Sequence, residues 1–124
     1  MIRPIPKRLL PHKVKYLKYL GNNGESDSWE KPIILSYVKL EDHKTHQTTN
    51  NGREVYGNAK MFYDKINSNG LNERPIENSK IIFNEFEYLI KEIKTLYADS
   101  SNVHHYEMIL EWKSSITLLN VLLL

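Results

Sequence analysis

The sequence has no cysteine, and its five glycines do not gather into a phosphate-binding loop. The missing thiols exclude a disulfide framework, a thiol nucleophile and a cysteine-based zinc site. Neither the GxGxxG fingerprint nor the P-loop motif occurs, and no nucleophile elbow surrounds a serine. We therefore predict that the protein is not an enzyme and uses no cofactor.

Long apolar runs are missing as well. The longest, residues 116–124, is much shorter than the roughly 20 residues that a membrane-spanning helix needs. The first 20 residues are basic, contain three prolines and lack the apolar segment of a secretory signal. We accordingly expect no membrane contact, and the absence of cysteine fits a protein made inside a cell.

Five histidines raise the question of a metal site. His104 and His105 are adjacent, so on a strand their side chains would point to opposite faces and would not share one ion. His105 and Glu107 would share a face, but two ligands are too few for structural zinc. We predict structural or surface roles for the histidines and no metal.

The clearest strand pattern runs from His105 to Lys113. Apolar residues alternate with polar ones, and Ile109 alone breaks the polar set. A period of two sends these sets to opposite faces of a strand. The residues predicted to face the core are Tyr106, Met108, Leu110 and Trp112.

The preceding segment fits two structures. The apolar residues between Phe86 and Tyr97 follow a helical spacing, and Asn84 with Glu87 would cap such a helix. Alternatively, residues 81–83 form a strand that turns at Asn84-Glu85 into a second strand, rich in aromatic and β-branched residues. Periodicity slightly favours the helix but leaves the choice open.

The chain resembles the minor capsid protein family of tailed phages and prophages in four stretches: MIRPIPKRLLPH, AKMFYD, KIIFNEFEY and LYADSSNVHHYEM. Such proteins are encoded in the head–tail joining module and are similar to siphophage stopper, or head-closure, proteins. The resemblance covers roughly residues 1–110 and includes no catalytic motif. It implies a small β-barrel and therefore favours strands for residues 84–97. Past Trp112 the chain departs from the family pattern.

We expect one all-β domain, a small antiparallel β-barrel of about six strands built as a meander, with one long polar loop. Residues 1–11 would form an extended arm, because its three prolines disfavour a helix or a central strand. Residues 12–113 would form the barrel and 114–124 a C-terminal tail. Residues 31–40 have apolar side chains on both faces, which indicates a strand covered on both sides, either central to a barrel or buried by a partner.

The most unusual segment is the polar stretch 41–58, which has no large apolar residue before Val55. A loop of this length is usually functional or disordered, and a long β-hairpin would also fit. In a ring of connector subunits the part from about His43 to Tyr56 would face the channel and contact DNA phosphates without reading sequence. A loop on the outside of the neck is the alternative. The residues predicted for the channel contact are Lys44, Thr48, Thr49, Asn50, Asn51 and Arg53.

Charge is distributed unevenly along the chain. Residues 1–20 contain six lysines and arginines and no acidic residue, which indicates a nucleic-acid or acidic protein partner, or simply a solvated basic arm. We predict that the arm contacts a neighbouring subunit or the adaptor; a strap across its own barrel is the alternative. The arm residues predicted to make this contact are Arg3, Pro4, Ile5, Pro6, Lys7 and Arg8.

The resemblance implies a structural protein of the virion neck, a head–tail connector or stopper that closes the portal channel and joins head to tail. The implied partners are further copies in a homo-oligomeric ring, the portal–adaptor complex, tail-terminator proteins and, without sequence specificity, packaged DNA. One alternative is another neck component, an adaptor or tail-completion protein, of which adaptors tend to be helical. The other is an OB-like module that binds nucleic acid non-specifically.

Overall fold

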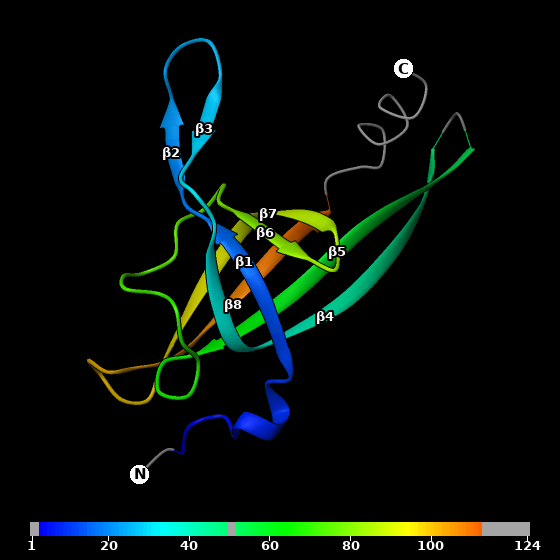
Figure 1. The fold of residues 1–124 in the computed structure, drawn as a ribbon. Helices are drawn as coiled ribbons and strands as arrows, with labels where there is room; N and C mark the ends of the chain where they lie inside the picture. Colours follow the sequence, from blue (N-terminus) through cyan, green and yellow to red (C-terminus); the bar gives the residue numbers. More distant parts are fainter. Residues whose placement is uncertain (1–2, 50–51, 113–124) are drawn as a thin grey trace.

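The structure is a computed structural model that describes residues 3–49 and 52–112. In this part of the chain a single 3₁₀ turn precedes eight strands (Figure 1). In chain order they are η1 (Lys7–Leu9), β1 (His12–Leu17), β2 (Tyr19–Asn22), β3 (Asp27–Trp29), β4 (Ile33–Thr49), β5 (Gly52–Asp64), β6 (Lys80–Phe83), β7 (Phe86–Tyr97) and β8 (Val103–Trp112). None of the helical residues described forms a segment long and apolar enough to span a membrane.

Six of the described strands close into an antiparallel barrel in the order β1-β4-β5-β8-β7-β6, which confirms the predicted fold class. The expectation of a single meander is wrong. The barrel consists of two three-stranded meanders, β1-β4-β5 and β6-β7-β8, whose outer strands pair as β5 with β8 and β6 with β1. Residues 65–79 link one meander to the other, so the chain changes meander once, after β5.

The barrel interior is filled by one apolar cluster to which all six barrel strands contribute. On β8 the alternating pattern is confirmed, because Tyr106, Met108 and Leu110 are buried and Trp112 is partly buried against them. The opposite face of β8 is half-buried or exposed. The other buried members of the cluster are Val14, Tyr16, Leu35, Val38, Leu40, Ala59, Met61, Tyr63, Ile81, Tyr88 and Ile90.

The ambiguous segment forms strands, as the resemblance implied. β6 and β7 make a tight hairpin whose turn residues Asn84 and Glu85 have φ angles of 50° and 69°. Positive φ at both central positions is the signature of a type I′ turn, which matches the twist of paired strands. Further along β7 the register shifts between Ile90 and Glu92, so Lys91 is an extra residue opposite β8.

A second bulge explains the apolar residues on both faces of the segment 31–40. The pairing of β1 with β4 skips Tyr37, which has a φ of 57°, so that Leu35 and Val38 are both buried although they are three positions apart. In the single chain, the segment 31–40 is not covered on both sides. Ile33 and Ile34 are 41% and 48% exposed.

The polar stretch 41–58 forms a β-hairpin, one of the two structures that the sequence allowed, and not an irregular loop. β4 and β5 remain paired in continuous register from Val38↔Tyr63 to Thr49↔Gly52, and the ribbon extends far beyond the barrel (Figure 1). A second, shorter ribbon of β2 and β3 projects from a different side. The polar segment 25–31 therefore includes a strand, β3.

The N-terminal arm is extended only in part, because residues 7–9 form the η1 turn. Pro6 precedes this turn and fixes the backbone before it, at a φ of −60°. The expectation of an arm without helix is therefore wrong for one turn. Lys113 and the expected tail, residues 114–124, lie outside the described residues.

Gly70 offers a direct test of how tightly the 65–79 connection packs on the barrel. Its φ is 126°, and a Cβ would lie 2.4 Å from the Ile34 carbonyl oxygen and 2.6 Å from Leu35 Cδ2. We expect Gly70→Ala to lower the free energy of unfolding by roughly 2–4 kcal/mol, because the backbone must shift as well as adopt a strained φ.

The matched control is Gly21→Ala. Gly21 has a φ of 107° with no atom within 4 Å of the added Cβ, so only the conformational strain, about 1 kcal/mol, should be lost. Urea denaturation of both variants measures the difference. Equal losses would show that steric packing at Gly70 contributes nothing.

Candidate interaction surfaces

The projecting ribbon contains the predicted channel residues that the structure describes. By register, Lys44 is opposite Gly57, Thr48 is opposite Arg53 and Thr49 is opposite Gly52. Asn50 and Asn51 lie outside the described residues. From Leu40, at the barrel wall, to Thr49 the strand spans roughly 30 Å at about 3.3 Å per residue. The ribbon therefore places these backbone positions well away from the barrel.

The base of this ribbon is tied to the barrel by a tyrosine. Tyr88 of β7 is buried and donates a hydrogen bond from its hydroxyl to Asp42 Oδ1 at 3.0 Å. Burial, together with this carboxylate, raises the pKa of Tyr88 to about 12. The phenol thus remains a hydrogen-bond donor at any physiological pH, and it fixes β4 at the point where the strand leaves the barrel.

The N-terminal arm is bound to its own barrel by its backbone. The Ile5 N–H donates to Asp64 Oδ1 at 2.9 Å, and Asn67 Nδ2 donates to the Ile5 carbonyl oxygen at 2.7 Å. The Arg3 carbonyl oxygen accepts a hydrogen bond from His104 Nε2 at 2.6 Å. The strap arrangement therefore describes the single chain, while the predicted contact of residues 3–8 with a neighbour stays a prediction.

Asp64 is the centre of this attachment, and sequence reasoning missed it. Its side chain is fully buried, and its Oδ2 accepts the N–H groups of Ile66 and Asn67 at 3.1 and 2.8 Å. Ser68 Oγ accepts the Asp64 N–H at 2.8 Å and donates to the Tyr37 carbonyl oxygen. The sequence signal was an aspartate at the end of an apolar strand, followed by turn-forming residues, which is the pattern of an Asx turn.

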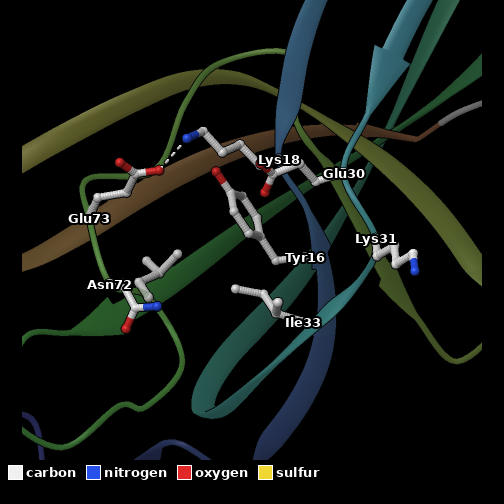
Figure 2. Close-up of a pocket in the computed structure, with 8 residues that line it drawn as sticks. Tyr16, Lys18, Glu30, Lys31, Ile33, Asn72 and Glu73 are labelled. Carbon is white, nitrogen blue, oxygen red and sulfur yellow. Dashed lines mark ion pairs between the residues drawn. The ribbon is translucent and has the colours of Figure 1, made fainter.

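A small cavity of about 130 Å³ lies beside β1, between Tyr16, Ile33 and the 65–79 connection (Figure 2). Lys18 and Glu73 form an ion pair of 2.5 Å at its edge, and this carboxylate raises the pKa of Lys18. The ion pair joins the end of β1 to the 65–79 connection across the mouth of this cavity.

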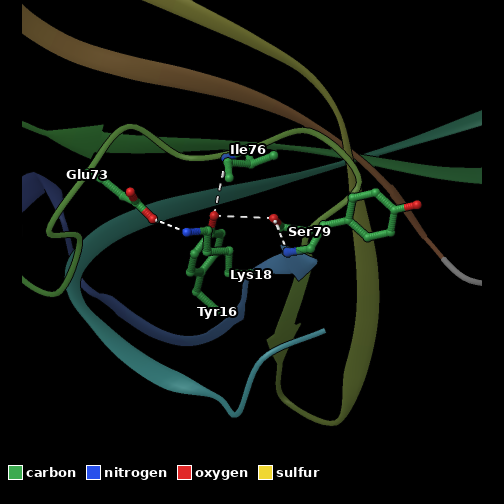
Figure 3. A network of polar contacts seen from close by, with 6 residues as sticks. Tyr16, Lys18, Glu73, Ile76 and Ser79 are labelled. Atoms are coloured by element: carbon green, nitrogen blue, oxygen red, sulfur yellow. Dashed lines mark hydrogen bonds and ion pairs between the residues drawn. The ribbon is translucent and has the colours of Figure 1, made fainter. Parts of the chain in front are cut away.

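The polar groups behind this cavity attach the connection to the barrel. Tyr16 Oη accepts hydrogen bonds from the Ile76 N–H and from Ser79 Oγ, each at 3.2 Å (Figure 3). Ser79 Oγ in turn accepts the Tyr19 N–H at 3.0 Å. These groups satisfy one another, which indicates a structural network.

The paired histidines differ from the prediction. His104 Nδ1 and His105 Nδ1 are 2.8 Å apart, whereas the strand pattern predicted rings on opposite faces. The reason is a third bulge: Leu96 pairs with His105 and Tyr97 with Val103, so His104 is the extra residue and leaves the alternation. Among the described residues, no group of three or more His, Cys, Asp or Glu side chains is placed to hold a metal ion.

We expect Asp64→Asn to release the arm. The substitution places an amide donor among N–H donors, so at least one buried hydrogen bond is lost, at a cost of about 1–3 kcal/mol. Hydrogen exchange at the Ile5 amide should accelerate, and urea denaturation should report the loss of stability.

Asp99→Asn is the control for this substitution. Asp99 also caps a turn, accepting the N–H groups of Ser101 and Asn102 at 2.9 and 3.0 Å, and these hydrogen bonds lower its pKa to about 2. Because Asp99 is exposed, its replacement should cost less and leave the Ile5 amide protected. Unchanged exchange at Ile5 in Asp64→Asn would refute the attachment.

Comparison with known proteins identifies the family. A search of curated proteins finds no match to the chain. The family model described as "Minor capsid protein" matches residues 6–110, which include all six barrel strands apart from the last residues of β8. Since the match spans most of the sequence, the chain belongs to the minor capsid protein family and is a structural component of a phage virion.

Proposed function

We propose that this minor capsid protein is a head–tail connector of the stopper type. In this role, copies of the chain form a ring beneath the portal and its adaptor, close the channel and join the head to the tail-terminator proteins. The observation that carries the proposal is the β4–β5 ribbon, a polar two-stranded extension on a closed barrel. The closed barrel is a rigid body, and the ribbon extends well beyond it.

The stability of the barrel does not explain the ribbon. Residues 43–54 include no large apolar side chain, so this part of the ribbon adds little to a core. In a ring with cyclic symmetry, ribbons that point inward from every subunit meet around the axis, and we propose this orientation. Their function is then performed at the centre of the channel, where the portal delivers DNA.

The backbone of the ribbon also suits closure of a channel. Beyond Asp42, β4 pairs within the described residues only with β5, so one edge of each strand carries hydrogen-bonding groups that a neighbouring ribbon can pair with. Edge pairing between subunits would form a plug. Lys44 and Arg53 would contact phosphates when DNA fills the channel, without reading its sequence.

The fold bears on the alternatives. Adaptors tend to be helical, and the described residues contain only one 3₁₀ turn besides strands. The OB-fold is a five-stranded barrel, whereas this barrel has six strands in the described part of the chain. A stopper or a tail-completion protein therefore fits better than an adaptor or an OB-like module, and the ribbon favours the stopper.

Shortening the ribbon tests this role. We expect a variant in which a short Gly-Ser linker replaces residues 45–53 to fold, because the pairs from Val38↔Tyr63 to Lys44↔Gly57 remain. Particles carrying it should assemble heads and necks but lose packaged DNA before tails attach. DNA retention, measured by nuclease protection of tail-less particles, gives the readout.

The control replaces residues 23–26, the turn of the β2–β3 ribbon, by the same linker. This variant shortens a different projection and should retain DNA. If the particles with the shortened β4–β5 ribbon hold their DNA and remain infectious at wild-type levels, the gating role is refuted and only the connector role remains.

A further inference from the structure

A groove with a volume of about 590 Å³ lies between the N-terminal arm and the barrel wall. Its volume is in the range of sites that bind small ligands or short peptide segments. The η1 turn forms one side, and the start of β1 with the bulge of β4 forms the other. The lining residues are Lys7, Arg8, Leu10, Pro11, His12, Lys13, Ser36 and Tyr37.

The groove is basic, and its charges are not neutralised. Its lining contains three cationic side chains and no acidic one. Four other lysines of the described chain form ion pairs with glutamates: Lys18, Lys39, Lys80 and Lys91. In that same part of the chain, Arg8 and Lys13 have no acidic partner within ion-pair distance, and Lys7 lies 4.6 Å above the Tyr37 ring. The groove therefore concentrates positive potential where an anion can enter.

Tyr37 is held in a strained conformation at the edge of this groove. Its φ of 57° lies in the left-handed region, which bulky side chains rarely adopt, and the residue is 42% exposed. This conformation belongs to the bulge that lets Leu35 and Val38 both be buried. The Tyr37 ring itself is not part of the buried core and lines the groove, where it can contact a partner.

The walls of the groove are fixed before any partner arrives. Leu10 is buried, and its N–H donates to the Lys7 carbonyl oxygen at 2.9 Å. His12 accepts the Leu40 N–H on Nδ1 at 3.0 Å, and its ring packs against Phe83 at 4.8 Å. A preformed site of this kind loses little conformational entropy on binding.

We propose that this groove binds an acidic segment of a partner polypeptide. Carboxylates of the segment would pair with Lys7, Arg8 and Lys13, Arg8 being suited to bidentate contact, and an apolar residue would pack against the Tyr37 ring. The inference rests on the groove itself and does not require the stopper role.

The shape and place of the groove favour a polypeptide over DNA. A duplex presents a convex rod of phosphates, whereas this site is a concavity whose lining includes Leu10 and Pro11. The η1 turn, which lines the groove, also lies far from the outer ends of β4 and β5 (Figure 1). If the ribbon faces the DNA channel, the groove faces other proteins of the particle.

The test uses a labelled peptide with glutamates on both sides of one phenylalanine, and a short labelled DNA duplex as the competing probe. We expect the intact chain to bind the peptide, measured by fluorescence anisotropy, and to show amide chemical-shift changes at Leu10, Ser36 and Tyr37. Arg8→Glu with Lys13→Glu should weaken peptide binding by at least about tenfold. Tyr37→Ala, which changes no charge, should also weaken it.

Arg74→Glu with Lys31→Glu is the matched control, because both residues are exposed and lie outside the groove while the change in net charge is the same. It should alter peptide affinity by no more than about twofold. Melting curves verify that each variant is folded. Equal weakening by both double variants, an absence of shifts at the groove amides, or tighter groove binding of the duplex than of the peptide would each overturn the proposal.

Discussion

This fold depends on barrel closure, in which the outer strands of one three-stranded meander pair with the outer strands of the other. Each three-stranded meander has two outer strands whose backbone groups need partners, and the barrel satisfies them by joining β5 to β8 and β6 to β1. Only in the closed arrangement do side chains from both meanders share one interior. The 65–79 connection must then link the two meanders, and buried Tyr16 and Tyr63 accept hydrogen bonds from its N–H groups at Ile76 and Leu71.

Closing so small a barrel requires sharp local curvature, and β-bulges at Tyr37, Lys91 and His104 provide it. Each bulge also shifts which residues face inward. Ile90 is buried in the core and the partly buried Ile93 packs against it, although they are three positions apart, a spacing that resembles a helical period. The bulges explain why periodicity alone did not decide between helix and strand for residues 84–97. They also explain why a regular alternation places apolar side chains of residues 31–40 on both faces. The β8 segment that the alternation covers has no bulge between His105 and Trp112, and there the pattern predicted the core correctly.

The sequence also located the projecting ribbon, because its polarity is local and continuous, but it did not find the Asp64 attachment or the basic groove. The hydrogen bond from Ile5 to Asp64 joins residues that are 59 positions apart, and that from His104 to Arg3 joins residues 101 positions apart. Only the closed barrel brings such residues together. The backbone of the arm is bound to its own barrel, and its basic side chains form one wall of a preformed groove.

We propose two functional regions on this barrel, a polar ribbon for the channel and a basic groove for protein partners. A cryo-electron microscopy reconstruction of the particle neck tests this picture most directly. The account predicts a ring of barrels below the portal, with the β4–β5 ribbons pointing to the axis and the η1 turns in contact with neighbouring proteins. Barrels located elsewhere in the capsid, or ribbons that point away from the axis, would contradict it.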